Sequence, residues 1–207
     1  MQREDGGVYH KLTSRYHVDF IMPEEDKDLF YAYDVSSMAT GDFCASMALA
    51  ARVYKSVDEV FANKMAEAAK KAWAWLETNP AVFFDNPKDS GTGSYGDSTD
   101  KDERLWAAVE MFYLATEAGE NTEKYKDSIL ALLHDETIVY DFGWADVSGF
   151  ALLAVLNDSR KLLGEEVYDD CVKIVLEEAD RLNALSKNNA FALGMDRKDF
   201  CWGSNMV

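Results

Sequence analysis

Apolar residues recur at helical spacing along most of the chain beyond residue 36. Phe43, Met47, Ala50, Ala51 and Tyr54 fall on one face of a first helix, and Phe61, Met65, Ala68, Ala72 and Trp75 on one face of a second. The sequence S-V-D-E at Ser56–Glu59 predicts a capping box that opens the second helix, and Asn79-Pro80 predicts its end. Two helices joined by so short a turn run antiparallel, so an αα-hairpin is predicted here.

The same unit is predicted twice more. A helix over about residues 102–117 is followed, after Gly119, by a helix that carries Tyr125, Ile129, Leu132 and Leu133 on one face. A third pair is expected over about residues 145–156 and 165–185. The chain is therefore predicted to be all-α, with three αα-hairpins that repeat one structural unit.

The predicted hairpins close tightly at one end and are connected at the other by long loops, residues 80–101 and 135–144. Loops of that length in a compact domain are usually functional, so a site is expected at this end. Residues 1–35 are expected to be irregular. Their many aromatic residues indicate that they lie against the body of the protein, because exposed loops rarely carry so many rings.

The first long loop enters its helix through an acidic cluster. The cluster contains Asp97, Asp100, Asp102 and Glu103, with Ser98 and Thr99 among them. Carboxylates, hydroxyls and carbonyls at this spacing suit Ca²⁺, which prefers several oxygen ligands. Alternatively, the acidic residues only cap the helix and complement its dipole. The cluster does not match the EF-hand pattern, and its spacing leaves both interpretations open.

The second long loop carries the sequence G-W-A-D at Gly143–Asp146. Asp146 either caps the following helix or completes a cation site with the first loop, if the two loop ends meet. Aromatic residues that lie next to glycine or polar turns could stack on sugar faces; they are Tyr9, Tyr95, Trp144 and Trp202. Trp73, Trp75 and Trp106 lie within predicted helices and are expected in the core.

Composition narrows the classes of partner. The 207 residues are 48% apolar and 13% aromatic, enough for one domain with a substantial core. The formal net charge of −17, from 38 acidic and 21 basic residues, disfavours nucleic acids and anionic membranes. No apolar run approaches the roughly 18 residues of a membrane span, and the N-terminus has no apolar signal-peptide region.

Reactive side chains show no known pattern. Cys44 and Cys171 fall on apolar helix faces and are interpreted as core thiols, and together with Cys201 they lack metal-binding spacing. The histidines, His10, His17 and His134, lack the spacing of a zinc site. The sequence contains no G-x-S-x-G motif and no P-loop.

Seven short motifs follow one another along the chain. They are D-G-G-V-Y-H-K-L-T at 5–13, M-P-E-E-D at 22–26, V-S-S-M-A-T-G-D-F at 35–43, A-A-R-V-Y-K at 50–55, A-A-K-K-A-W-A-W-L at 68–76, T-G-S-Y-G-D with D-E-R-L-W-A-A at 92–108, and W-G-S-N at 202–205. In order and spacing they resemble glycoside hydrolase family 9, the inverting endoglucanases and related cellulases. The chain looks most like the branch whose catalytic domain follows an immunoglobulin-like module.

The resemblance implies an (α/α)6 barrel, in which six hairpins form a ring with the active cleft across one end. Three hairpins would be about half of that ring, so residues 1–207 are expected to be a single partial catalytic domain, truncated at both ends. The family's catalytic aspartate lies in a D-A-G-D motif and its catalytic glutamate in an N-E motif, and this sequence contains neither. No catalytic residue is therefore assigned. The chain is expected to be a segment of a β-1,4-glucan hydrolase that is inactive alone.

The resemblance also implies where ligands bind. A structural Ca²⁺ is expected at Ser98, Asp102, Glu103 and Asp146, which joins the two acidic loops. The expected lining of the cleft for β-glucan or cellulose is His10, Tyr95, Trp144 and Trp202. An extracellular or periplasmic location is implied by the family alone.

Two other interpretations stay open. The chain could be a helical scaffold that binds carbohydrate or a protein without catalysis, or part of another α/α-barrel enzyme such as an epimerase or a lyase. A half ring would also expose helix faces, which favours self-association or pairing with the missing part of the domain.

Overall fold

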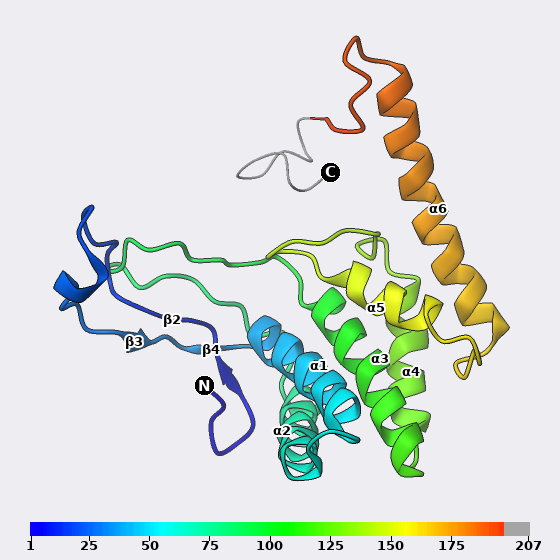
Figure 1. The fold of residues 1–207 in the computed structure, drawn as a ribbon, viewed down its shortest axis with the longest axis horizontal. Coiled ribbons are helices and arrows are strands. Elements are labelled where there is room, and N and C mark those ends of the chain that lie inside the picture. The colour runs from blue at the N-terminus through cyan, green and yellow to red at the C-terminus, as the bar shows by residue number, and fades with distance from the viewer. Residues whose placement is uncertain (197–207) are drawn as a thin grey trace.

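The computed structural model describes residues 1–196, and this part of the chain is mainly helical (Figure 1). Its helices are α1 (Ser37–Tyr54), α2 (Glu59–Thr78), α3 (Lys101–Ala118), α4 (Glu123–Leu133), α5 (Ser148–Leu156) and α6 (Glu165–Lys187). They are preceded by the short strands β1 (Val8–Tyr9), β2 (Leu12–Thr13), β3 (Tyr31–Ala32) and β4 (Val35–Ser36), and by a 3₁₀ turn at Pro23–Glu25. The prediction of three consecutive helix pairs is confirmed.

The helices form two layers. The first helices of the three pairs, α1, α3 and α5, lie in one layer, where α3 contacts both α1 and α5. The second helix of each pair packs on its own partner, so α2 covers α1, α4 covers α3 and α6 meets α5. Figure 1 shows that α6 extends well beyond the rest of the helical body. Among residues 1–196, no helix combines the length and apolar character needed to cross a membrane.

Side chains at the helix ends explain where the helices begin. The Ser36 hydroxyl accepts a hydrogen bond from the Ala39 N–H at 3.1 Å and caps α1. At α2 the cap is Asp58, whose carboxylate accepts from the Phe61 N–H at 2.9 Å. The prediction of a capping box at Ser56 is therefore wrong. Val57 and Asp58 both donate to the Tyr54 carbonyl, so Ser56 lies inside the turn that closes α1.

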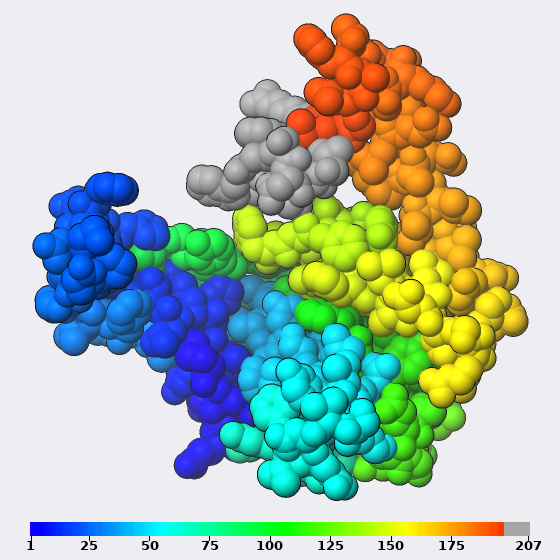
Figure 2. All heavy atoms as spheres, viewed as in Figure 1, coloured from blue at the N-terminus to red at the C-terminus, as the bar shows by residue number. Residues whose placement is uncertain are grey.

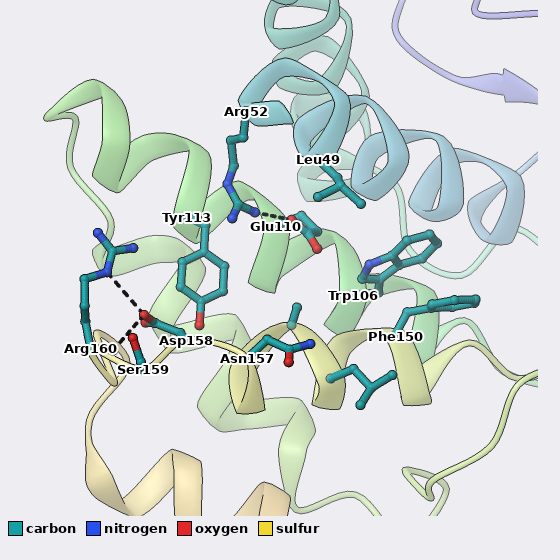
Figure 3. A pocket seen from close by; sticks show the side chains of 12 residues that line it. Leu49, Arg52, Trp106, Glu110, Tyr113, Phe150, Asn157, Asp158, Ser159 and Arg160 are labelled. Carbon is teal, nitrogen blue, oxygen red and sulfur yellow. Dashed lines mark hydrogen bonds and ion pairs between the residues drawn. The ribbon is translucent and has the colours of Figure 1, made fainter. Parts of the chain in front are cut away.

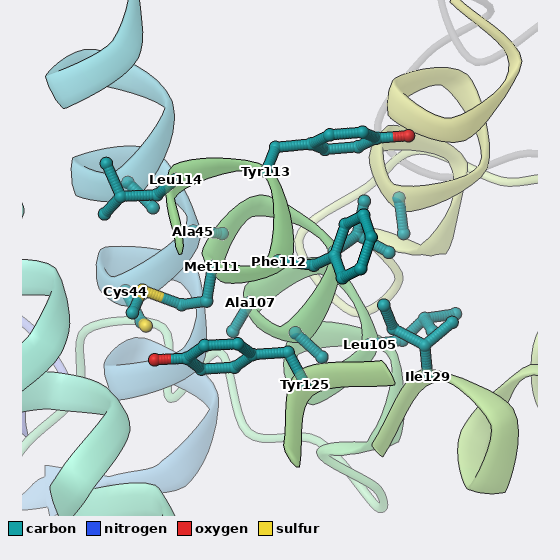
Figure 4. Packing of buried hydrophobic residues seen from close by; sticks show 14 of the residues in the cluster. Cys44, Ala45, Leu105, Ala107, Met111, Phe112, Tyr113, Leu114, Tyr125 and Ile129 are labelled. Carbon is teal, nitrogen blue, oxygen red and sulfur yellow. The ribbon is translucent and has the colours of Figure 1, made fainter. Parts of the chain in front are cut away.

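The core lies between the two layers and is built from small and large side chains in alternation. Fully buried alanines on the facing helices, such as Ala45, Ala69 and Ala107, let the helix backbones approach closely. Larger side chains, among them Leu105, Met111 and Ile129, fill the space around them (Figure 4). Cys44 and Cys171 are buried free thiols, as expected. Trp73 and Trp75 are also in the core, whereas Trp106 is only half-buried.

One apolar stripe lies elsewhere than expected. In α2 the buried residues are Ala62, Met65, Ala69, Ala72, Trp73, Trp75 and Leu76. Phe61, placed on the buried face by the spacing analysis, is 38% exposed and contacts Tyr54 instead, with ring centroids 4.9 Å apart. The stripe is displaced because the alanines of α2, rather than its first aromatic residue, face α1.

The N-terminal segment departs most from the prediction. β1 pairs antiparallel with β4, and β2 pairs antiparallel with β3, so residues 1–36 form a long two-stranded arm. Val8 and Tyr33 are buried at its base. The outer part projects away from the helices (Figures 1 and 2), and there Phe20 and Phe30 are largely exposed. The expectation that this segment lies against the body holds only for its base, because strand pairing carries residues 14–30 away from the helices (Figure 1).

Candidate functional site

The two long loops meet through a pair of exposed aromatic rings. Tyr95, from the loop between α2 and α3, and Trp144, from the loop between α4 and α5, contact edge to face with centroids 6.2 Å apart. Tyr95 is 55% exposed and Trp144 is 51% exposed. Their polar neighbours and exposed faces give a surface on which a sugar ring can stack. Tyr95 has φ = 51°, which is uncommon for a residue with a side chain and indicates a position held by its surroundings.

His10 fixes the loop that carries Tyr95. The Ser36 hydroxyl accepts from the backbone of Ala39, so its own proton is free to be donated to His10 Nδ1, 2.8 Å away. The other ring nitrogen, Nε2, then donates to the Ser94 carbonyl at 3.0 Å. The ring stacks on Phe84 with centroids 4.2 Å apart, and its burial lowers the His10 pKa. His10 is thus a neutral spacer that positions the residue next to Tyr95.

Lys11 is a second anchor, which the sequence patterns did not single out. Its Nζ donates to Asn86 Oδ1 at 2.6 Å, to Thr92 Oγ1 at 3.1 Å and to the Gly93 carbonyl. The ammonium also lies 4.6 Å from the centroid of the Tyr33 ring. A lysine next to His10 in a motif was the available signal. Its effect is to bind the first long loop to the base of the N-terminal arm.

The acidic cluster lies below these loops, at the start of α3. Asp102 and Glu103 are each only 2% exposed. One carboxylate oxygen of Asp102 accepts from the Val147 N–H at 2.8 Å, which ties the end of the second long loop to the start of α3. The other oxygen, Oδ1, is buried and has no hydrogen-bond partner among residues 1–196, and the same is true of Glu103 Oε2. Burial, followed by the charge of Asp102, raises the pKa of Glu103.

Two further carboxylates join this cluster. Asp97, from the first loop, has a buried Oδ2 without a partner, and burial raises its pKa. Asp42 lies on α1 and has a buried Oδ1 without a partner. Burial raises the pKa of Asp42 to about 7, and the charges of Asp102 and Asp97 raise it further in the same direction. The sequence placed Asp97 in the acidic loop but gave no reason to place Asp42 beside it.

The remaining predicted site residues lie at the edges of the cluster. Asp146 Oδ1 accepts from the Ser148 N–H at 2.9 Å and from its hydroxyl. The N-cap residue of α5 is Val147, so Asp146 holds the turn before the helix and is not its cap residue. Burial, with the nearby charge of Asp102, raises the pKa of Asp146 to about 6. Ser98 is exposed, and its N–H donates to Asp97 Oδ1. Trp202 lies outside the described residues.

The donor chemistry of the cluster fits a hard cation. One carboxylate oxygen each of Asp42, Asp97, Asp102 and Glu103 is buried without a hydrogen-bond partner from the described residues, and a buried polar atom left in that state is costly. Oxygen-rich sets of this kind are what Ca²⁺ prefers. Across residues 1–196, however, no three acidic, histidine or cysteine side chains are gathered closely enough to hold an ion as they stand. The fit is one of chemistry, and an ion would have to draw the oxygens together.

A separate hollow of about 520 Å³ opens on the face of the α1–α3–α5 layer (Figure 3). It is lined by Leu49 and Arg52 of α1, by Trp106, Glu110 and Tyr113 of α3, and by Phe150, Leu153, Ala154 and Asn157–Arg160 in and after α5. Glu110 is 2% exposed and is paired with Arg52 at 2.5 Å. The Tyr113 hydroxyl is buried and has no hydrogen-bond partner in the part of the chain that the structure describes. Exposed Leu49 and Phe150 complete a face that combines apolar and unsatisfied polar groups.

Comparisons with known proteins agree on one family. The family model described as "Glycosyl hydrolase family 9" matches residues 1–206. The cellodextrinase of Butyrivibrio fibrisolvens is 37% identical over all of this chain, which covers 39% of that protein. Endoglucanase D of Acetivibrio thermocellus is 33% identical over 99% of the chain and 32% of its own length.

Solved structures give the same result. A thermostable endoglucanase of Alicyclobacillus acidocaldarius superposes with a TM-score of 0.85 at 33% identity, over 98% of this chain and 37% of that one. The structure of AaCel9A in complex with cellobiose-like isofagomine superposes with a TM-score of 0.86 at 32% identity, over 98% and 38%. The chain thus spans less than two fifths of these relatives. The six helices of residues 1–196 match part of an (α/α)6 barrel, as expected.

Proposed function

Because the chain belongs to glycosyl hydrolase family 9, we propose that it is a segment of the catalytic domain of an inverting β-1,4-glucan hydrolase of the endoglucanase or cellodextrinase type. The observation that carries this proposal is the exposed Tyr95–Trp144 pair at the junction of the two long loops. Family members are typically extracellular, and we extend that location to this protein.

The residues of this chain bind and position the glucan in the proposed reaction. Tyr95 and Trp144 stack against the sugar faces. His10 and Lys11 position the first loop by donating hydrogen bonds to the Ser94 and Gly93 carbonyls. An inverting reaction requires a carboxylic acid and a carboxylate separated by about 6.5–9.5 Å, with water between them. We assign neither group to this chain, and propose that other parts of the domain supply both.

A structural Ca²⁺ is the second part of the proposal. Asp102, Glu103, Asp146 and the backbone at Ser98 would hold it, with Asp97 close by. The ion would neutralise carboxylates that have no hydrogen-bond donors and would hold the two loops together. The ion would keep the Tyr95 and Trp144 rings in a fixed position relative to each other, since each ring is carried by one of those loops.

The hollow on the α1–α3–α5 layer is where we propose that the rest of the domain packs. In a complete ring this layer faces the other inner helices, and relatives are more than twice as long as this chain. The alternative occupant is a second copy of the chain, since exposed apolar residues such as Leu49 and Phe150 favour self-association.

Replacing Tyr95 with alanine is expected to weaken the binding of cello-oligosaccharides about twofold to thirteenfold, because one stacking surface of roughly 0.5–1.5 kcal/mol is lost. Titration with cellotetraose, followed by tryptophan fluorescence, measures the change, and Trp144 remains as a nearby reporter. Tyr54→Ala is the matched control, because Tyr54 is also an exposed tyrosine but lies at the far end of α1. Equal affinities for both variants would place sugar binding elsewhere.

The chain alone is expected not to hydrolyse carboxymethylcellulose, because neither catalytic carboxylate is assigned to it. Reducing-sugar release from the purified 207-residue chain should equal that of a control without protein. Release above the control would show that the catalytic groups are present after all. Sugar binding without hydrolysis would also be the result for the alternative function, a carbohydrate-binding scaffold. Addition of the remaining domain segments distinguishes the two, since only a hydrolase segment would gain activity.

A further inference from the structure

We propose that Asp42 is a further acidic ligand of the cation site, so that the ion fastens α1 as well as the two loops. This inference rests on the proposed Ca²⁺ site and extends it from the loops to the helical layer. With Asp42 included, the ion would connect α1, the start of α3 and the start of α5, which are the three helices of one layer.

Close packing of α1 on α3 brings Asp42 to the site. A side-chain carbon placed on Gly41 would lie only 2.7 Å from Glu103 Cβ and 3.1 Å from the Glu103 carbonyl oxygen. The two helices therefore meet at Gly41, and only glycine allows this approach. Asp42 is the next residue along α1 from this point of contact.

The groups that face Asp42 are acidic. The charges of Asp102 and Asp97 act on it, and it acts in turn on Glu103. Its Oδ1 is buried and has no hydrogen-bond partner within the described residues. A partly buried carboxylate near three others, with one oxygen that lacks a donor, favours the binding of a proton or a cation.

Nearby cationic side chains do not fill this role. Lys101 is turned toward Asp135, with Nζ 2.6 Å from its carboxylate. Arg104 pairs with Asp100 at 2.7 Å and donates to the carbonyls of Leu76 and Asn79. Both cations next to the cluster in sequence are thus engaged elsewhere. A bound hard divalent cation is the counter-charge that the oxygen donors fit, and an added carboxylate raises the affinity of such sites.

The test is calcium binding to the metal-free 207-residue chain by isothermal titration calorimetry, with melting curves recorded in calcium and in chelator. Asp42→Asn is expected to weaken Ca²⁺ binding about tenfold or more. In chelator the same variant should melt at or above the temperature of the unsubstituted chain, because one buried like charge has been removed. Asp127→Asn on α4, an exposed position that loses the same charge, is the control and should leave both quantities unchanged.

Three results would overturn the inference, and they are distinguishable. If the unsubstituted chain does not bind Ca²⁺, the proposed cation site fails and the role of Asp42 fails with it. If the unsubstituted chain binds, Asp102→Asn does not, and Asp42→Asn binds normally, only the role of Asp42 fails. If Asp42→Asn lowers the melting temperature equally with and without calcium, Asp42 is a packing residue of α1.

Discussion

Removal of calcium is expected to lower the melting temperature of this protein by about 5–10 °C. An ion present at 100 times its dissociation constant stabilises the folded state by about 2.7 kcal/mol. In a domain of this size each kcal/mol corresponds to roughly 2–4 °C. The physical source of the effect is the set of buried carboxylate oxygens on Asp42, Asp97, Asp102 and Glu103. When the ion is absent, these oxygens have neither a hydrogen-bond donor from the described residues nor a counter-ion.

The pH dependence of this effect follows from the direction of the pKa shifts. In the metal-free protein the pKa of Asp42 is raised to about 7 and that of Asp146 to about 6, so folding favours their protonated forms. That contribution is complete below the ordinary carboxyl pKa and is lost as the pH rises through 6 and 7. The loss of stability caused by a chelator should therefore be larger at pH 8 than at pH 5.

Differential scanning calorimetry in excess EGTA and in excess Ca²⁺ measures both effects. The Asp102→Asn variant is the control, because it should lose most of the response to calcium. Identical melting temperatures in chelator and in calcium, at both pH values, would contradict the cation site. Recovery of the original melting temperature on re-addition of Ca²⁺ separates loss of the ion from irreversible damage by the chelator.

Replacing Arg52 with methionine is expected to cost about 3–5 kcal/mol of unfolding free energy. The Glu110 side chain is only 3% exposed, and Arg52 is the cation paired with it. Methionine keeps the apolar contact along the arginine stem but leaves the carboxylate buried and uncompensated. Burial already raises the pKa of Glu110, while the Arg52 charge lowers it. Without Arg52, protonation of Glu110 should relieve part of the loss at low pH.

Urea denaturation of a set of variants measures the cost of leaving the Glu110 carboxylate buried without a paired cation. Adding Glu110→Gln to Arg52→Met should recover much of the stability, since a neutral amide replaces the unpaired charge. Lys70→Met is the matched surface control, because Lys70 pairs with Glu120 at 2.7 Å with both side chains well exposed. Exposed pairs contribute at most about 1 kcal/mol. Equal losses for Arg52→Met and Lys70→Met would show that burial of Glu110 does not set the cost.

The helices could be predicted from the sequence because their signals are local. Apolar spacing and the break at Asn79-Pro80 each act within a few residues, and the helix pairs lie where they predict. The prediction of where α2 begins failed because Ser56 and Asp58 are both good capping residues. The turn after Tyr54 decides between them. The prediction for the N-terminal arm failed because its many aromatic residues indicated burial, whereas the pairing of β2 with β3 leaves rings of the arm exposed.

The site was only partly accessible to sequence reasoning. Resemblance to the family joined Asp102 to Asp146, and the structure adds a hydrogen bond from the N–H of Val147, the next residue after Asp146, to the Asp102 carboxylate. Asp42 could not be found in this way, since it lies 60 residues before Asp102 and reaches it only through the close contact of α1 with α3 at Gly41. Contacts of this kind depend on tertiary packing, and no local pattern encodes them.

The long helix α6 has a consequence for how the chain opens. Its buried residues are Val167 and Cys171, both in the first two turns, while the later turns extend beyond the helical body (Figure 1). Backbone hydrogen bonds that are not covered by tertiary packing exchange their amide hydrogens through local opening rather than through global unfolding. The beginning of α6 therefore belongs to the same cooperative unit as α5. The rest of the helix is expected to fray and re-form while the two long loops and the aromatic pair stay in place.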